Sequence, residues 1–333
     1  MKKSLIALAV AGAMTAPMIA QADATLYGSF RIGVESVEDA DLNVEDQSSR
    51  IGIKGDIDLG LEGTKGLFHW EANVSTADSN EYGGGQMFGQ RLGYIGAKGD
   101  WGQVLIGRQY HPHYLLISAP TNLFNPGSGN WGERFNLGND QHKRVDNTIA
   151  YYTPKMNGFQ AIAGFVLQSD GSDSDVDGAL DDDVDGYNVA GTYSANNVTV
   201  SASYGHVEAS DTVEVDTWGL SAKYKLDALE LMLKYEDQET EIGTANDQEE
   251  DVWELGARYT MGATSVYARY ADYDTENNFE LVDGQVVDAD YQQWGIGVTQ
   301  KLGKGRVFLE HVKNDSDDVV AGDRTTAGYR VDF

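Results

Sequence analysis

Acidic residues form one dense run that could bind a divalent cation. Residues 170–185 read DGSDSDVDGALDDDVD. Four aspartates match ligand positions of a calcium-binding loop: Asp173, Asp175, Asp177 and Asp181. The twelfth position, where such loops need a bidentate glutamate, is Val184. We therefore expect a solvated acidic loop without a confident metal site, and weak association of Ca²⁺ or Mg²⁺ is the alternative.

Histidines and nucleophiles do not form a recognisable catalytic motif. A hydrolase needs a nucleophile next to a base that a third group orients. The six histidines are His69, His111, His113, His142, His206 and His311. None of them stands in a known nucleophile motif. Two of them flank Pro112, a weak indication of metal binding that favours a plain loop role.

Arginines are the remaining charged groups with a regular placement. Sequence alternation puts Arg31, Arg50 and Arg144 on the polar faces of predicted strands. It puts Arg91 on the face opposite Leu92 and Tyr94 and leaves Arg108 undecided. These guanidinium groups could form an electrostatic site. In the alternative interpretation they only pair with nearby aspartates: Asp56, Asp58 or Asp146.

Alternating apolar and polar residues predict the elements that position these groups. In 49–59, isoleucines and Leu59 alternate with charged residues and glycine, which is typical of a strand with two different faces. About sixteen such segments are expected: 25–37, 49–59, 65–77, 86–98, 102–109, 144–153, 158–168, 186–194, 197–207, 214–226, 229–238, 251–261, 263–273, 290–301, 304–313 and 324–333.

The connections between these segments alternate in length. Short turns are expected at 60–66, 99–101, 154–158, 195–197, 226–228, 261–263 and 302–305. Long polar loops are expected near 38–47, 78–85, 110–143, 169–185, 208–213, 239–250, 274–289 and 314–323. Short turns on one side and long loops on the other are the plan of an outer-membrane barrel. A soluble β-sandwich, the competing interpretation, would not sort its loops so regularly.

The composition of the two strand faces favours contact with lipid. Apolar faces carry aromatic residues such as Trp218, Trp253 and Trp294, which suit membrane interfaces. The opposite faces hold arginine, lysine, glutamate, threonine and glycine, which suit a water-filled lumen. Because lipid cannot satisfy a free sheet edge, the sheet must close. The sequence therefore predicts an all-β, 16-stranded antiparallel transmembrane β-barrel.

Residues 110–143 interrupt the alternation for more than thirty residues. A structureless stretch of this length inside a compact domain indicates a functional loop. Its bulky apolar residues, among them Leu123 and Phe124, are not needed on a solvated surface. We expect this loop to fold inward and pack against the barrel wall.

Residues 1–22 and the overall charge bound the location of the protein. Lys2 and Lys3 precede an apolar run, and residues 20–22 offer a small-residue cleavage site, so residues 1–22 are predicted to be a cleaved secretory signal peptide. The barrel domain is expected to span 23–333. Net charge is −29, which makes nucleic acid an improbable partner.

Several motifs resemble those of the Gram-negative general porins. They are ATLYGSFRIGV, SSRIGIKGD, QRLGYIGAKGDWGQVLIGRQY, the long loop that follows, and the terminal AGYRVDF. The resemblance implies a sixteen-stranded barrel in the bacterial outer membrane, assembled as a homotrimer, with the third outer loop bent inward as a constriction. It also implies contacts with lipid and lipopolysaccharide. Phe333 is similar to the signal read by the outer-membrane assembly machinery.

The same resemblance assigns constriction residues. Arg50, Arg91 and Arg144 match the wall arginines of the family, and Arg31 and Arg108 match less firmly. Family members carry several acidic groups on the constriction loop, whereas this loop has only two, Glu133 and Asp140. The difference puts cation selectivity in doubt and leaves an anion-tolerant constriction open.

The function that the resemblance implies is passive diffusion of ions and small hydrophilic solutes through a water-filled channel. No enzymatic activity and no cofactor are expected, apart from weak Ca²⁺ or Mg²⁺ at acidic outer loops. Such ions could bridge to lipopolysaccharide phosphates. The alternatives are a structural or adhesive outer-membrane barrel and, behind it, a membrane-embedded hydrolase barrel.

Overall fold

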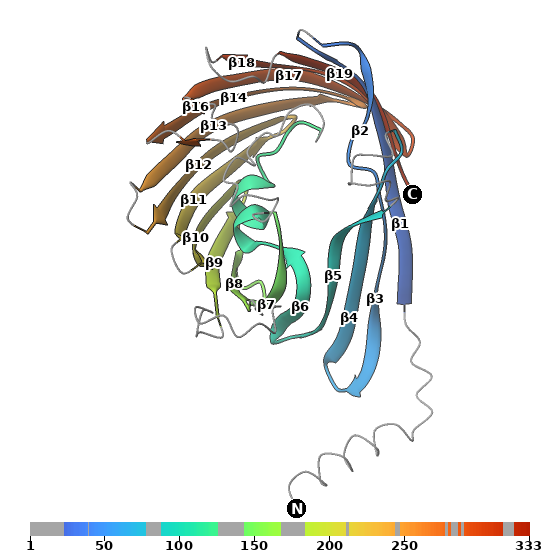
Figure 1. The fold of residues 1–333 in the computed structure, drawn as a ribbon. Helices are drawn as coiled ribbons and strands as arrows, with labels where there is room; N and C mark the ends of the chain where they lie inside the picture. Colours follow the sequence, from blue (N-terminus) through green and yellow to red (C-terminus); the bar gives the residue numbers. More distant parts are fainter. Residues whose placement is uncertain are drawn as a thin grey trace, which may run out of the picture.

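One antiparallel sheet forms the wall of the molecule (Figure 1). The computed structural model describes residues 23–38, 40–77, 88–125, 143–167, 184–210, 213–243, 247–276, 279–280, 286–287, 290–315 and 323–333. The sheet has 17 strands, and without the four-residue strand β2 sixteen strands build the wall. They are β1 (Asp23–Val37), β3 (Arg50–Leu61), β4 (Thr64–Val74), β5 (Phe88–Gly99), β6 (Gly102–Tyr110), β7 (Arg144–Tyr152), β8 (Phe159–Val166), β9 (Gly186–Ala195), β10 (Val198–Ser210), β11 (Val213–Leu226), β12 (Leu229–Ile242), β13 (Gln248–Met261), β14 (Thr264–Glu276), β17 (Tyr291–Leu302), β18 (Gly305–Asp315) and β19 (Arg324–Asp332).

The first and last strands pair with each other and close the barrel. Their register runs from Ser29 opposite Asp332 to Val37 opposite Arg324. Beyond β19, Gly28 and Phe333 exchange two backbone hydrogen bonds of 3.1 Å. The pairing leaves no long free edge of the sheet facing lipid. A sheet in a bilayer must close in this way, because lipid cannot hydrogen-bond to unpaired backbone groups. The predicted sixteen-stranded antiparallel barrel is confirmed.

Tight turns join the strands along one rim. Asn196, Asp227 and Gly262 have φ values of 50°, 49° and 60°, in the left-handed region that two-residue hairpin turns need. Each of these residues directly follows a long strand, as the sequence predicts. The short connections therefore lie where expected.

The distribution of apolar and charged residues is the reverse of that in a soluble protein, with apolar residues on the outer surface and charged residues inside. Trp253 and Ile95 on the outer surface are 53% and 66% exposed, whereas Lys234 and Glu310 are fully covered. This distribution matches a barrel with lipid outside and charged groups within. Among the described residues, no helix is long and apolar enough to cross a membrane.

The long-loop rim differs from the sequence-based prediction. Strands β10, β12 and β13 continue through polar residues that were expected to be loop, near 208, 239–242 and 248–250. A short strand, β2 (Asn43–Asp46), pairs with β1, and β15 (Phe279–Glu280) pairs with β16 (Val286–Val287). Beyond the bilayer neither face of a strand contacts lipid, so apolar and polar residues no longer alternate. The backbone hydrogen bonds continue there, and the strand therefore extends past the end of the sequence pattern.

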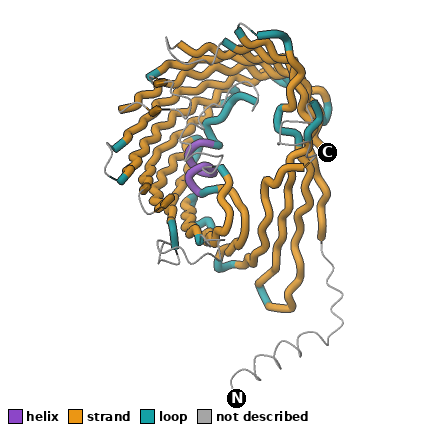
Figure 2. The backbone as a smooth tube through the Cα atoms, viewed as in Figure 1, coloured by secondary structure: helices purple, strands orange, loops and turns teal. Residues whose placement is uncertain are grey.

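The first half of the long loop lies inside the barrel. It contains one helical turn, η1 (Tyr114–Ser118), which contacts β9, β10, β11 and β12. Figure 2 shows this turn enclosed by the ring of strands. Residues 126–142 of the loop, and the predicted signal peptide 1–22, lie outside the described residues.

Candidate functional site

A cavity with a volume of about 930 Å³ lies within the barrel beside the inward loop. Nine cationic residues line it: Arg31, Arg50, Arg91, Lys143, Lys225, Arg258, Lys301, Arg306 and Arg330. Among the described residues that line it, two are acidic: Asp227 and Glu230. In a chain with a net charge of −29, the described lining of this cavity is thus cationic.

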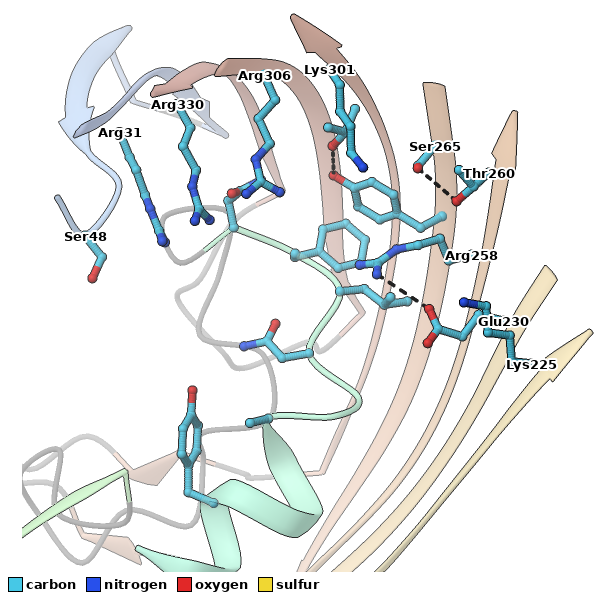
Figure 3. A pocket seen from close by; sticks show the side chains of 18 of the residues that line it. Arg31, Ser48, Lys225, Glu230, Arg258, Thr260, Ser265, Lys301, Arg306 and Arg330 are labelled. Carbon is cyan, nitrogen blue, oxygen red and sulfur yellow. Dashed lines mark hydrogen bonds and ion pairs between the residues drawn. The ribbon is translucent and has the colours of Figure 1, made fainter. Parts of the chain in front are cut away.

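Four of these cations form one row across four neighbouring strands. Lys301 on β17 stands opposite Arg306 on β18, and Arg306 stands opposite Arg330 on β19. Arg330 is in turn opposite Arg31 on β1. Figure 3 shows these four side chains pointing into the cavity. Like charges directly opposite each other destabilise a sheet. A row that lowers the stability of the barrel in this way indicates a functional role.

One carboxylate partly balances this row. Asp332 lies 2.7 Å from Arg330 Nε and 3.4 Å from Arg306 Nη2. Arg31 donates a 2.8 Å hydrogen bond to Ser29 Oγ and forms no ion pair with a carboxylate within the described part of the chain. Four cations and one carboxylate leave the row with an excess of positive charge.

A second row on the opposite wall is partly balanced. Lys225, Glu230 and Arg258 stand in register on β11, β12 and β13. Arg258 Nη1 lies 3.6 Å from Glu230 Oε2, and Figure 3 shows the pair facing the cavity. The field across the lumen is therefore uneven, with its larger positive excess on the wall built by β1, β18 and β19.

The arginines assigned from the resemblance gather near the loop. Arg91 Nε lies 2.6 Å from Glu71 Oε1, and Arg50 Nη1 lies 3.8 Å from the same oxygen. The Arg144 guanidinium lies over the ring of Tyr110, 5.5 Å from its centroid. Arg50 and Arg91 line the cavity, as do Tyr110 and Lys143, so these predicted residues share one region of the lumen.

The predicted orientation of Arg91 relative to Tyr94 is wrong. Both side chains lie on the inner face, since Arg91 bonds Glu71 and Tyr94 OH bonds His69 Nδ1 at 2.7 Å. The reason is a β-bulge: Glu71 pairs with Leu92 and Ala72 pairs with Gln90, which leaves Arg91 as the extra residue. A bulge shifts the alternation by one residue and re-aims the side chain.

Arg108 does not line the cavity. Its Nη1 lies 2.6 Å from Asp146 Oδ2, and the Asp146 side chain is 62% exposed. A register irregularity between Gly107 and Gln109 separates Arg108 from the regular pairing of β6 with β7. For this residue the structure shows the pairing with aspartate that the sequence left open as an alternative.

The inward loop is held to the wall by polar contacts. Ser118 Oγ donates a 2.5 Å hydrogen bond to Glu236 Oε1, and His113 Nε2 lies 3.1 Å from the same atom. Ser221 Oγ donates to the Leu116 carbonyl at 2.8 Å. These contacts fix the loop against β11 and β12. The two acidic residues of the predicted constriction loop, Glu133 and Asp140, lie outside the described residues.

Glycines on three inner strand faces make room for the loop. A Cβ at Gly219 would lie 2.8 Å from His113 Cε1 and 2.9 Å from Ile117 Cγ2. At Gly256 it would lie 3.0 Å from Leu123, and at Gly295 it would lie 2.8 Å from Phe124. We call these three glycines the glycine track. Since any side chain there would displace the loop, the track sets how closely the loop approaches the wall.

Sequence reasoning missed five of the cavity residues: Lys225, Arg258, Lys301, Arg306 and Arg330. The strand boundaries and alternation carried a signal for Arg330, which stands on the polar face of the last strand. Closure of the predicted barrel makes the first and last strands neighbours, but no pattern in a single sequence shows which of their residues stand opposite each other. The cross-strand row became visible only with the register.

No group of three or more potential metal ligands occurs in the part of the chain that the structure describes. The candidate divalent-cation run, Asp173, Asp175, Asp177 and Asp181, lies outside that part. It stays a prediction.

A closed transmembrane β-barrel with a charged, water-accessible lumen and an inward loop defines an outer-membrane channel. Residues 7–318 match the profile of the family described as Gram-negative porin. The chain belongs to this family and is an outer-membrane protein.

Curated relatives and solved structures agree with this assignment. An outer membrane porin protein of Bordetella pertussis is 27% identical over 71% of this chain and 69% of that protein. Major outer membrane protein P.IB of Neisseria gonorrhoeae is 33% identical over 48% of this chain and 46% of that protein. The structure of an anion-selective porin from Comamonas acidovorans has a TM-score of 0.75 at 21% identity and covers 94% of this chain and 100% of its own.

Proposed function

We propose that the protein is a water-filled channel for passive diffusion of ions and small hydrophilic solutes, with a preference for anions. The observation that carries this proposal is the cross-strand row of Arg31, Arg330, Arg306 and Lys301 in a cavity whose described lining holds nine cations and two acids. A passing anion is attracted by these fixed charges and a cation is repelled, since lumen charges set selectivity. The anion selectivity named for the Comamonas acidovorans porin supports the proposal.

The uneven field also acts on dipolar solutes. The larger positive excess lies on one wall, while on the other Glu230 forms ion pairs with Lys223 and Arg258. A polar solute would align with this field, whereas an apolar solute would have to displace ordered water without compensation. Small hydrophilic molecules would therefore pass faster than apolar molecules of equal size.

A channel is favoured over an enzyme or an adhesive barrel by the same cavity. The family and the fold indicate a non-enzymatic channel. We propose further that the protein catalyses no reaction. An adhesive barrel would have no use for like charges placed opposite each other in its lumen.

We also propose the remaining partners expected from the sequence. A structure described as the trimer form of OmpT of Vibrio cholerae has a TM-score of 0.71 at 15% identity, which supports a homotrimer for this chain. Membrane lipid and lipopolysaccharide would contact the outer surface, and the assembly machinery would bind the strand that ends at Phe333. Cross-linking of the native protein in detergent would test the trimer; monomers alone would contradict it.

Single-channel recording in a planar bilayer tests the channel itself. Purified protein is expected to insert and produce stepwise ohmic conductance, and proteoliposomes are expected to swell in small sugars and amino acids. A properly folded preparation that leaves the membrane electrically silent would overturn the proposal. A plugged hydrolase or adhesive barrel would give that silent result.

A further inference from the structure

One histidine on the inner face of the barrel wall is hydrogen-bonded through both of its ring nitrogens. His69 on β4 lies 2.6 Å from Tyr27 OH through Nε2 and 2.7 Å from Tyr94 OH through Nδ1. It is half-buried and lines a cavity of about 380 Å³ formed by residues of β1, β3, β4, β5 and β6. Since an unperturbed imidazole titrates near pH 6.5, a histidine in a water-filled lumen can change its charge within the physiological range.

The hydrogen bonds of His69 form a chain with a single direction. Glu71 pairs with Arg91 and, as a carboxylate, only accepts hydrogen bonds, so Tyr27 OH donates to Glu71 Oε2 at 2.7 Å. The Tyr27 oxygen must then accept a hydrogen bond from His69 Nε2–H. The other nitrogen of a neutral imidazole is an acceptor, so Tyr94 OH donates to Nδ1. Neutral His69 therefore satisfies both tyrosines with one tautomer.

A glycine lets this chain cross a strand. Tyr27 on β1 and Glu71 on β4 both stand opposite Gly52 on β3, which lies between them. A Cβ at Gly52 would lie 2.6 Å from Tyr27 Cζ, so a glycine is needed for the ring to reach across to β4.

The chain ends on two arginines of the wall. Glu71 Oε1 lies 2.6 Å from Arg91 Nε and 3.8 Å from Arg50 Nη1. Both arginines line the 930 Å³ cavity, whereas His69 lines the smaller one. One hydroxyl group and one carboxylate thus connect the imidazole to the cationic part of the lumen.

Charged groups on the neighbouring strands determine what a proton on His69 meets. Lys54 on β3 stands directly opposite His69 and repels a second positive charge, whereas Glu71 attracts it. Lys98 on β5 and Asp56 on β3 form an ion pair of 2.7 Å and largely cancel each other. The other charged or titratable groups placed around His69 by the described strands are Asp23, Tyr27, Arg50, Arg91 and Tyr94.

We infer that His69 is a specificity-determining residue whose own charge makes the anion preference depend on pH, and that Tyr27 couples this charge to Glu71. The inference rests on the proposed channel function and its anion preference. Arg50, Arg91 and Glu71 bring two positive charges and one negative charge, a net charge of +1. Protonation of His69 raises the net charge of this group to +2.

The change of charge follows from the chain of hydrogen bonds. In the neutral form, His69 adds no charge to the lumen. Below about pH 6.5 it takes up a proton from solvent at Nδ1, and Tyr94 turns from donor to acceptor. The imidazolium then offsets part of the attraction that Glu71 exerts on passing cations, so Cl⁻ is favoured more strongly in acid.

Zero-current potentials across a KCl gradient test the inference in wild type and His69→Gln, from about pH 7.5 to about pH 5.5, on both sides of the ordinary histidine pKa. Glutamine keeps one donor and one acceptor, as in the neutral imidazole, and cannot be protonated in this range. At the higher pH the two channels are expected to share one Cl⁻ to K⁺ permeability ratio. At the lower pH the wild-type ratio is expected to exceed that of His69→Gln by about threefold, the order of effect of one unit charge beside the path.

Two results would overturn the inference. One is an equal ratio for the two channels at the lower pH. The other is a difference of the same size already at the higher pH, which would mean that His69 acts through the structure of the wall and not through its charge. Heat-modifiable electrophoretic mobility shows whether each variant forms a barrel, and His69→Asn replaces His69→Gln if the latter does not.

His311→Gln is the matched control. His311 on β18 lies 2.9 Å from Thr325 Oγ1 and packs edge-on against Trp294, whose side chain is exposed on the outer face. Its charge lies outside the lumen, so this variant is expected to keep the wild-type response to pH. Equal loss of the response in both variants would contradict a specific role for His69.

Tyr27→Phe tests the coupling to Glu71. Without the hydroxyl group, the imidazolium loses its hydrogen-bonded link to the carboxylate, so more acid is expected to be needed for the same rise in the ratio. An unchanged pH response in Tyr27→Phe would overturn the coupling.

The outcomes separate this inference from the proposed function. A wild-type channel that prefers K⁺ at every pH contradicts the proposed anion preference. An anion-preferring wild type whose response to pH equals that of His69→Gln contradicts only the present inference.

Discussion

Two regions of the barrel place like charges opposite each other, with opposite sign and on opposite faces. In the lumen, Arg31, Arg330 and Arg306 form a cationic row. Beyond the outward-facing aromatic residues, Asp237, Asp251 and Asp274 form an acidic row across β12, β13 and β14. Asp251 shares its face with Trp253, on the outside of the barrel.

The two rows differ in what surrounds them. The acidic row faces outward, with Asp274 exposed and Asp237 and Asp251 half-buried, so salt can screen part of the repulsion between these charges. The cationic row faces an enclosed lumen, where Arg31 is only 4% exposed and screening is weaker. The net charge of the whole chain therefore does not indicate the charge along the permeation path. Although the whole chain has more acidic than basic residues, the enclosed cationic row is the one that acts on the permeating ion.

Neutralising the cationic row should have the largest effect. In Arg31→Gln/Arg306→Gln/Arg330→Gln, the lumen loses its positive excess, and the Cl⁻ to K⁺ permeability ratio should fall by at least about tenfold. Reversal potentials in a planar bilayer measure this. The second set, Arg50→Gln/Arg91→Gln/Arg144→Gln, should shift the ratio in the same direction. Retention of the wild-type ratio in both sets would remove these arginines from the path.

Filling the glycine track should disturb the loop that shapes the lumen. Gly295→Ala places a Cβ 2.8 Å from Phe124, so either the loop or the wall must move. Overpacking of this kind costs about 1–3 kcal/mol, which should appear as a lower unfolding temperature and a changed conductance. Gly191→Ala is the control, since its Cβ would lie at least 3.5 Å from Phe159. Equal behaviour of the two variants would contradict the role of the track.

Neutralising the acidic row should leave ion preference intact. Asp237→Asn/Asp251→Asn/Asp274→Asn relieves two like-charge contacts and should stabilise the barrel by about 1 kcal/mol at low salt. Urea titration in detergent at two salt concentrations would show a gain that shrinks as salt rises. A large shift of the reversal potential in this variant would mean that the outer charges, and not the lumen, govern selectivity.

Breaking the Arg108–Asp146 pair should have the smallest effect. The pair lies at an exposed carboxylate, and such ion pairs contribute about 0–1 kcal/mol. Arg108→Gln should therefore change stability only slightly and leave the permeability ratio at its wild-type value. If Arg108→Gln moved the ratio as far as Arg31→Gln does, the assignment of Arg108 outside the cavity would be wrong.

Local sequence pattern predicted much of the wall. Alternation around Ile51 and Ile53 and the turn at Asp227 follow from short-range rules, since one face meets lipid and left-handed turn positions favour glycine, asparagine and aspartate. Strand ends near 208 and 239 were placed too early, because polar strands above the bilayer show no alternation.

The site was predicted less completely, for three physical reasons. The bulge at Arg91 reverses alternation and cannot be seen without a partner strand. The row of Arg31 and Arg330 depends on closure of the barrel, which brings together residues about three hundred positions apart. The contact between the inward loop and Glu310 depends on tertiary packing, so no sequence pattern indicated Glu310.

The zero-current potential of the wild-type channel across a KCl gradient tests the central claim most directly. If the enclosed cations govern permeation, the potential will have the sign of Cl⁻ preference, despite a sequence pI of about 4.3. A potential with the sign of K⁺ preference at low salt would show that the acidic surface dominates. That result would contradict the account.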